Sequence, residues 1–492
     1  MMLKKFNLAL SLLIGCVAYA QNENDVLRYS TTDIYGSARF EAMAGSFGAL
    51  GADFSAIQIN PAGMARFSNS QISFSLNNAS VNTEALYNGV NTQGRNNSFK
   101  ISNVGFVLTN DVSNRNDGRL YNQFTFGYTR LKNFDFNSKY RGQNFYSLLD
   151  VYANSGQGID PESIYSERPF TTGLAYDVYA LDYDPSTGEY YSRLTMGDMY
   201  HNREMSSSGG IGEFHIAYSE NYMNQWYYGG SIGIRRFNYE ESYNHNERLL
   251  DTVGTTLRSF NYLYDQSTTG TGYNLKLGAI YLPTDNLRVG FAFESPTIAT
   301  LEDNWRANMT ANHDYGTESI PSEYVPEGQF EYRIKTPMKL RGSFAYIFNY
   351  RGAINVDLEF VRFNAGKLRP ANTLNAQQYS FQFENQEVSN QFRSVLNTRI
   401  GFEYMVLRDI FVRAGYALLP QPYKNDVGNT KTPNQTFSGG LGWKKNNIML
   451  DLSYRLLKLN SDYYAFDPSK EENRAIMTSD LHHVVFTFNY KF

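Results

Sequence analysis

The segment Ala353–Phe360, AINVDLEF, alternates between apolar and polar side chains over its whole length. Successive side chains of an extended strand point to opposite faces, so this alternation predicts a β-strand with one apolar face. A soluble β-sandwich buries such a face in its core, whereas a membrane barrel turns it toward lipid. Alternation alone does not distinguish a sandwich from a barrel. The lengths of the strands and of their connections distinguish them.

Other segments repeat the pattern, among them Leu287–Phe293, Leu396–Tyr404 and Asn447–Leu456. Roughly ten residues, tilted by about 40°, cover the ~25 Å apolar band of an outer membrane. We count fourteen such segments, which begin near residues 70, 99, 121, 211, 225, 270, 286, 337, 351, 395, 409, 434, 446 and 481.

The connections between these segments alternate in length. Those after even-numbered segments are mostly short, as at 221–224, 283–286, 349–352, 407–409 and 444–447. Those after odd-numbered segments are long, at 81–98, 135–210, 239–269, 296–336, 363–394, 420–433 and 459–480. Short periplasmic turns opposite long extracellular loops characterise outer-membrane barrels, and a sandwich gives no reason for this parity. The sequence therefore predicts an all-β, antiparallel 14-stranded barrel that crosses a Gram-negative outer membrane many times.

The composition agrees with strands that are apolar on one face only. The 492 residues include 39 Tyr, 34 Phe and 39 Gly, 42% are hydrophobic, and the mean hydropathy is −0.47. No segment after residue 20 approaches the ~20 consecutive apolar residues that a membrane-spanning helix needs, which excludes a helical membrane protein. No Pro-rich, Ser-rich or like-charged linker divides the chain, so we expect the barrel to occupy residues 70–492 as one domain.

The first twenty residues have the features of a signal peptide. Lys4 and Lys5 precede an apolar core at 8–17, and Ala18-Tyr19-Ala20 forms an A-x-A cleavage site. The segment Leu13–Cys16 also matches a lipoprotein cleavage box with Cys16 as the acylated residue. We expect cleavage after residue 20, and acylation of Cys16 stays open as the alternative.

The cysteine count and the net charge exclude several classes of function. Cys16 is the only cysteine, so cleavage after Ala20 would leave no disulfide, cysteine metal site or cysteine nucleophile. Cleavage would also remove two lysines, which leaves 42 basic residues (44 − 2) against 48 acidic ones. A net charge near −6 offers no basic surface for nucleic acid.

Residues 35–66, YGSARFEAMAGSFGALGADFSAIQINPAGMAR, resemble neither the signal peptide nor the strands. Small residues dominate this stretch, which suits packing in a confined space. It ends in Asn60-Pro61-Ala62-Gly63, a compact turn sequence, because Asn and Gly tolerate unusual backbone angles and Pro fixes its own. We expect residues 21–69 to fold as a plug inside the barrel.

The run from Gly36 to Gly63, with its several glycines, Asp53 and the Asn60-Pro61-Ala62 turn, resembles the N-terminal hatch of the FadL/TodX (OMPP1) outer-membrane family that transports hydrophobic compounds. The resemblance implies a 14-stranded barrel closed by this hatch, with Asn60, Pro61, Ala62 and Gly63 as residues that anchor the plug. The family's third strand carries a kink that opens the wall sideways. Here the third segment offers only Gly127 as a weak point, which puts lateral release in doubt.

A short amphipathic helix is predicted at Asn144–Asn154 within the longest connection. In the family, extracellular loop helices form a hydrophobic groove that captures ligand first. The resemblance implies that the groove is lined here by the apolar and aromatic residues of this helix, which are Phe145, Tyr146, Leu148, Leu149 and Tyr152. Packing of the same face on neighbouring loops is the open alternative.

The last segment ends the chain on an apolar aromatic face: Val484, Phe486, Phe488, Tyr490 and Phe492. Terminal aromatic alternation of this kind resembles the recognition signal for barrel-insertion machinery, so Phe492 is the predicted contact. The strand should also pair with the first one near Gln71–Asn77, which leaves no sheet edge open in lipid. We expect a monomer whose other partners are membrane lipid and a hydrophobic small molecule.

No motif for catalysis, metal or cofactor binding stands out. The six histidines (His201, His215, His245, His313, His482 and His483) lack a metal-ligand spacing of the H-E-x-x-H kind, and we find no G-x-S-x-G elbow, P-loop or dinucleotide fingerprint. His215 falls on the polar face of the fourth segment and should point into the lumen. We therefore assign no catalytic residue, no metal site, no cofactor and no enzymatic activity.

The resemblance implies passive uptake of hydrophobic small molecules, such as long-chain fatty acids or similar apolar ligands. Aromatic hydrocarbons, haem and other lipids fit an apolar pocket equally well, so the ligand stays open. The first alternative is a barrel that docks protein as a component of a secretion or surface-assembly system. The second, a general diffusion porin, is disfavoured by the plug.

Overall fold

The computed structural model describes residues 23–115, 117–194, 198–250, 254–373, 376, 379–424 and 432–492. The predicted signal peptide, Cys16 and the first residues of the expected plug lie outside the described residues. None of the helices in the described part of the chain has the length and apolar character required to span a bilayer.

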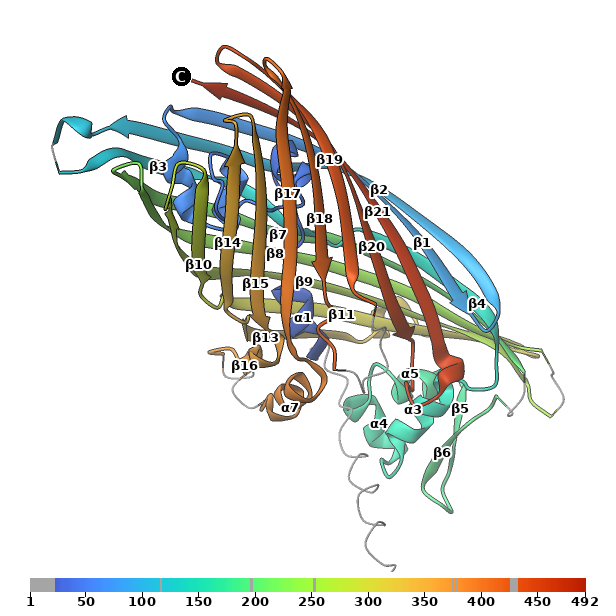
Figure 1. Cartoon of the computed structure of the whole chain (residues 1–492). Helices are drawn as coiled ribbons and strands as arrows, with labels where there is room; N and C mark the ends of the chain where they lie inside the picture. Colours follow the sequence, from blue (N-terminus) through green and yellow to red (C-terminus); the bar gives the residue numbers. More distant parts are fainter. Residues whose placement is uncertain are drawn as a thin grey trace, which may run out of the picture.

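Fourteen antiparallel strands close into one barrel, as the sequence predicts (Figure 1). Each strand pairs with its neighbours in chain order, and β21 pairs with β1 from Lys491–Gln71 to Ala475–Tyr87, which closes the ring. The strands are β1 (Gln71–Tyr87), β2 (Val90–Asp111), β3 (Arg119–Asn133), β7 (Met199–Tyr222), β8 (Trp226–Leu249), β9 (Leu257–Tyr281), β10 (Leu287–Glu294), β14 (Lys339–Phe348), β15 (Gly352–Arg362), β17 (Ser394–Leu407), β18 (Ile410–Leu419), β19 (Asn434–Lys445), β20 (Ile448–Tyr464) and β21 (Arg474–Lys491).

Tight turns join the strands at the end of the barrel where the C-terminus lies (Figure 1). In the β7–β8 turn, Met223 and Asn224 have φ values of 55° and 52°, and in the β14–β15 turn Asn349 and Tyr350 have 51° and 52°. Two successive positive φ values are the geometry that joins twisted antiparallel strands in two residues. This end is periplasmic by the layout of outer-membrane barrels, and the long connections lie at the extracellular end.

An apolar band surrounds the periplasmic half of the barrel. On β7 the outward side chains of Phe214 and Ile216 are 49% and 64% exposed, whereas the inward side chains of Glu213 and His215 are buried. The exposed apolar surface is the part that meets lipid, and the polar face lines the lumen.

Beyond this band the polarity of the two faces reverses. Along β8 the outward residues change from Ile232 to Asn238 and Glu240, while the inward residues change from Arg235 to Phe237 and Tyr239. Apolar side chains there turn away from water, as they do in a soluble protein. The prediction that 81–98 and 239–269 are loops is therefore wrong, because β1–β2 and β8–β9 continue through them as paired strands above the membrane.

Further elements build an extracellular extension on these strands (Figure 1). The connection predicted at 296–336 contains three strands, and the connection at 135–210 contains strands and three helices. The elements are β4 (Phe136–Asn144), α3 (Leu148–Gly156), α4 (Pro161–Glu167), α5 (Thr172–Asp177), β5 (Leu181–Asp184), β6 (Glu189–Ser192), β11 (Ile298–His313), β12 (Gly316–Ser319), β13 (Glu327–Lys335), β16 (Lys367–Pro370) and α7 (Gln382–Gln391).

The third barrel strand breaks at Phe134 and Asp135, between β3 and β4. β3 pairs with β2 as far as Thr129–Asn103, whereas the described pairing of β4 is with β7. Opposite the break, Gly209 of β7 has a φ of 104°, a conformation that favours glycine. The interruption thus lies at Phe134 and Asp135 rather than at Gly127, the one weak point that the sequence indicates.

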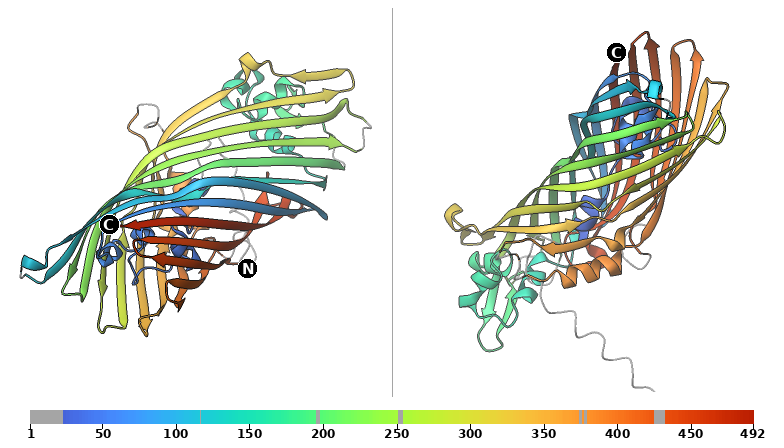
Figure 2. Two further views of the ribbon diagram at one scale, coloured as in Figure 1. Left: turned by 90° about the horizontal axis from the view of Figure 1, so that it is seen from above. Right: turned by 90° about the vertical axis from the view of Figure 1, so that its left-hand side faces the viewer.

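Residues 23–70 run down the inside of the barrel from the extracellular end to the start of β1 (Figure 2). They form α1 (Glu23–Ser30), α2 (Ala38–Ala42) and two 3₁₀ turns, η1 (Phe54–Gln58) and η2 (Pro61–Arg66). Their apolar side chains pack against small inward residues of the wall, including Ala217, Ala345 and Ala417. Small residues on both sides let the two backbones approach closely.

Substitution of Gly415 tests this close packing. A β-carbon at Gly415 of β18 would clash with the backbone of Met43 and Ala44 in the plug, whereas one at Gly342 of β14 would meet nothing within 4 Å. We expect Gly415→Val to displace the plug and to open an ion leak in planar-bilayer recordings, with Gly342→Val remaining closed. Recordings in which both variants stay closed would contradict the packing of the plug against β18.

Candidate transport path through the barrel

The Asn60–Gly63 turn is fixed by the side chain of Asn60. Its Oδ1 accepts a hydrogen bond from the Ala62 amide at 3.1 Å, which caps η2. Its Nδ2 donates to the Gly48 carbonyl within the plug at 2.7 Å and to the Ala279 carbonyl on β9 at 3.2 Å. Pro61 occupies the first position of η2, where its missing N–H costs nothing. One amide thus joins two parts of the plug to the wall.

Three further contacts fasten the plug to the wall, on β15, β17 and β20. Asp357 of β15 accepts hydrogen bonds from the Phe47 and Gly48 amides at 2.8 and 3.1 Å. Arg39 forms a two-pronged ion pair with Glu403 of β17, with both distances 2.8 Å. Glu41 pairs with Arg455 of β20 at 2.9 Å. Bidentate and charge-assisted bonds are the stronger class of hydrogen bond, so the plug is held as a defined structure.

A row of buried charges crosses the lumen wall next to the plug. Arg235 joins Glu213 to Glu294 at 2.6 and 2.5 Å, and Arg341 joins Glu294 to Glu359 at 2.9 and 2.6 Å. We call these five residues, together with Arg399, which pairs with Glu359 at 3.1 Å, the charge belt. Removal of one partner from a buried ion pair costs about 3–5 kcal/mol, because it leaves a charge without compensation.

Charged side chains on the inward faces of the strands line the lumen. Arg288 is half-buried and donates to the Leu50 carbonyl of the plug at 3.1 Å. The buried ones include Lys276, Lys339, Arg341, Asp357, Glu359, Arg399, Arg413, Asp451 and Arg455. Sequence reasoning missed Glu213, Arg235 and Glu294, although each falls on the inward face of its strand.

The first helix of the plug is surrounded by an apolar layer above the charge belt. Val26 and Tyr29 of α1 are fully buried, and the Tyr29 ring meets the edges of Phe237 at 5.8 Å and Phe134 at 6.3 Å. We call this layer the α1 cluster, and its wall residues include Leu131, Phe134, Ile211, Phe237, Tyr239, Ala299, Leu301, Tyr332 and Ile334.

The residues predicted to line an extracellular groove divide into two groups. Helix α3 starts at Leu148, four residues later than predicted, because the Ser147 side chain caps it by accepting from the Leu149 amide at 3.0 Å. Leu148, Leu149 and Tyr152 are buried against β8, β9 and β11, and Tyr146 packs at the edge of this core. Phe145 is 64% exposed. The apolar face of α3 is therefore covered by protein in this structure, and its role in ligand capture stays a prediction.

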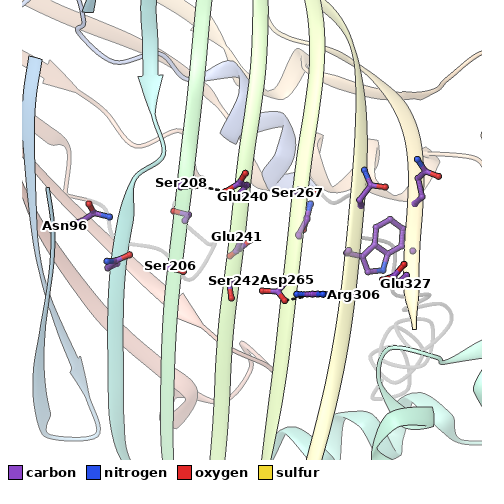
Figure 3. Close-up of a pocket in the computed structure, with 17 residues that line it drawn as sticks. Asn96, Ser206, Ser208, Glu240, Glu241, Ser242, Asp265, Ser267, Arg306 and Glu327 are labelled. Carbon is purple, nitrogen blue, oxygen red and sulfur yellow. Dashed lines mark hydrogen bonds and ion pairs between the residues drawn. The ribbon is translucent and has the colours of Figure 1, made fainter. Parts of the chain in front are cut away.

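A groove of about 800 Å³ crosses the outer face of the extracellular extension (Figure 3). Its side chains are almost all polar, and Glu240, Ser242, Asp265 and Arg306 are among those that line it. Helix α1 lies behind the sheet in this view. A wall of this composition suits water and polar groups, so we do not place an apolar ligand there.

Two histidines of the lumen take part in the plug region. His215 lies beside Glu213 with Nδ1 3.0 Å from its carboxylate, so it faces the lumen as predicted. Nδ1 of His483 accepts a hydrogen bond at 2.8 Å from Arg455, which is the partner of Glu41 in the plug. The last strand was predicted to begin near residue 481, but β21 begins at Arg474, so His483 lies within the strand at the level of the plug.

The model of one protein family matches residues 247–492, which is half of the chain. Its description is "Outer membrane protein transport protein (OMPP1/FadL/TodX)". Among curated protein sequences, none matches this chain significantly.

Solved structures support the fold over nearly the whole chain. The toluene transporter TodX of P. putida superposes with a TM-score of 0.53 at 14% identity, over 94% of this chain and 99% of TodX. A FadL homologue of Pseudomonas aeruginosa superposes with a TM-score of 0.58, also at 14% identity, over 94% of this chain and 100% of the homologue. At this identity the likeness establishes the barrel fold.

Loss of the Asn60 side chain tests whether it anchors the plug. Asn60→Ala leaves the Gly48 and Ala279 carbonyls without this donor, and each buried group that loses its partner costs about 1–3 kcal/mol. We expect a lower unfolding midpoint and faster proteolysis within residues 35–66 in detergent. Asn110→Ala, which removes an exposed amide bonded to Asn122, is the control and should change neither. Equal behaviour of the two variants would show that Asn60 does not anchor the plug.

Proposed function

This chain belongs to the OMPP1/FadL/TodX family of outer-membrane transport proteins, and we propose that it admits long-chain fatty acids or similar hydrophobic small molecules by passive passage through the plugged barrel. The α1 cluster is the observation that carries this proposal. It places an apolar layer within the lumen, directly above a wall of buried charges.

The α1 cluster supplies the free energy that an apolar ligand needs. Apolar surface transferred from water recovers about 25 cal/mol per Å². Val26 and Tyr29 of α1 already bury their apolar surface against this layer. An apolar ligand that enters the layer therefore competes with α1 for the same wall residues. Because α1 is the first described element of the plug, its displacement would loosen the plug from the extracellular side.

A small internal cavity of about 20 Å³ beneath this layer favours ligands with an acidic group. Five basic side chains and three acidic ones line it: Arg235, Lys276, Lys339, Arg341 and Arg399 against Asp33, Glu294 and Glu359. A surplus of positive charge next to an apolar layer complements a fatty-acid carboxylate. Lys339 also donates to Thr32 of the plug at 2.9 Å, so a carboxylate there would compete with a plug contact.

The break in the third strand offers a route past the plug. Side chains bridge this gap: Lys100 of β2 pairs with Asp135 in the break at 3.0 Å, and Thr92 of β2 donates to the Lys139 carbonyl of β4 at 2.5 Å. Two such bonds are easier to open than a continuous backbone ladder. We propose that an apolar ligand leaves the α1 cluster sideways at this gap once the plug has shifted, so the plug has to move but does not leave the barrel.

The family description names transport, so it supports neither catalysis nor the alternative of a protein-docking component in a secretion system. TodX is a toluene transporter, and monoaromatic hydrocarbons are accordingly the second ligand class to test beside fatty acids.

Exchange of Phe237, at the centre of the α1 cluster, tests ligand binding. Phe237→Asn removes one aromatic wall residue, and loss of about 1.5–3 kcal/mol of burial predicts at least tenfold weaker binding of a labelled long-chain fatty acid. The neighbouring Asn238 is exposed on the other face of β8, so Asn238→Ala is the matched control and should bind as the wild type does.

Folding of both variants is checked by the heat-dependent gel mobility of barrels before binding is measured. A folded Phe237→Asn variant that binds the fatty acid and toluene with wild-type affinity would contradict the α1 cluster as the binding layer. If the variant loses fatty-acid binding but binds toluene normally, Phe237 contributes to the binding of fatty acids and not to that of toluene.

A further inference from the structure

Two histidines and one carboxylate that the transport path does not use meet in the extracellular extension. They are His201 of β7 and His245 and Glu247 of β8. Strand pairing places His201 directly opposite Glu247, and His245 lies on the same face two residues before Glu247. All three side chains are completely buried, and all lie above the apolar band that marks the membrane. No metal-ligand spacing is visible in the sequence because one of the three residues, His201, comes from the neighbouring strand.

The donor atoms have the separations of a metal-ligand set. The Nε2 atom of His245 lies 2.8 Å and the Nε2 atom of His201 lies 3.7 Å from Oε1 of Glu247. One donor atom from each residue lies within 4.8 Å of the others. Tetrahedral bonds of about 2.0–2.2 Å to Zn²⁺ put neighbouring donor atoms about 3.3 Å apart, and both separations from Glu247 lie within about 0.5 Å of that value.

Neighbouring side chains orient the His201 ring. The Tyr87 hydroxyl lies 3.0 Å from Nδ1 of His201, and Asn144 donates to that hydroxyl at 2.6 Å, which fixes the ring with Nε2 toward Glu247. Among the described residues that Nε2 has no hydrogen-bond partner, although the backbone carbonyl of Tyr146 lies near the ring. A metal-bound histidine usually has a hydrogen-bond partner on its other ring nitrogen, as His201 has in Tyr87.

One basic side chain also faces the cluster. Arg203 lies opposite His245 in the strand pairing, and its guanidinium stacks 3.8 Å from the centre of the Tyr243 ring. Its positive charge opposes a cation and limits the affinity.

We propose that His201 Nε2, His245 Nε2 and Glu247 Oε1 bind a divalent first-row transition metal ion such as Zn²⁺. Imidazole nitrogens with one carboxylate suit Zn²⁺ and its neighbours rather than Ca²⁺ or Mg²⁺. The metal replaces the proton that His245 and Glu247 share in their hydrogen bond, and water completes the coordination.

The site would stabilise the extracellular extension. Glu247 also accepts hydrogen bonds from the Ser147 hydroxyl at 2.5 Å and the Leu148 amide at 2.8 Å, at the start of α3. The Phe466 ring covers both imidazoles, with ring centres 5.9 Å away in each case. A bound metal therefore connects α3 to β7 and β8 in a place shielded from water.

The experiment uses the full chain in detergent, stripped with a chelator and titrated with Zn²⁺ against a coloured competitor. We expect one Zn²⁺ per chain. Stoichiometric binding should be lost in each of the three ligand variants, His201→Gln, His245→Gln and Glu247→Gln. Tyr87→Phe should lower the Zn²⁺ affinity about 10–100-fold, because it removes the hydrogen-bond partner of His201 Nδ1. His482→Gln, outside the cluster and bonded to Tyr454, should bind as the wild type does.

A second readout separates coordination from folding. X-ray absorption of the zinc-loaded wild type should show two imidazoles and oxygen ligands, and the variants should keep the heat-dependent gel mobility of a folded barrel. No stoichiometric Zn²⁺ in the wild type, or equal binding by all three ligand variants, would overturn the proposal. Neither result depends on the transported ligand, so failure here leaves the proposed transport function standing.

Discussion

The charge belt is the constraint around which the lumen is built. In lipid the outward face of every strand has to be apolar and every backbone group has to be paired, which places polar side chains inside a closed ring. Buried charges there need partners, and Arg235 and Arg341 each join two carboxylates in one row. The plug fits this interior by supplying backbone groups and a few charges of its own, such as Arg39 and Glu41.

The sequence predicts the strands of the membrane band, because one rule governs their pattern of apolar and polar residues. Strands within the membrane band alternate with apolar residues outward, so fourteen segments and the parity of their connections could be found without a structure. The same alternation continues in β8 beyond Arg235, but with Phe237 and Tyr239 inward and Asn238 outward. This change of phase marks the level at which water replaces lipid, and the rule of apolar residues outward does not find the strand beyond that level.

Features that depend on neighbouring strands could not be predicted from one strand at a time. The break at Phe134 and Asp135 is accommodated by Gly209 on β7 rather than by a residue of its own strand. The burial of Leu149 needs the inner face of β8, β9 and β11, which the sequence presents as loops. The plug motif was visible because it is local, but the pairing of Asn60 with Ala279 and of Arg39 with Glu403 joins residues far apart in sequence.

Uptake by cells with a locked plug tests the central claim that apolar molecules pass through this barrel. Asn355 donates to the Ser46 hydroxyl at 2.7 Å, so Ser46→Cys with Asn355→Cys should connect the plug to β15 by a disulfide in a chain whose only cysteine is Cys16. Uptake of radiolabelled oleate should fall to the level of cells without the protein and should recover after reduction, while the Ser46→Cys single variant stays active. Equal uptake by locked and reduced cells would contradict the account.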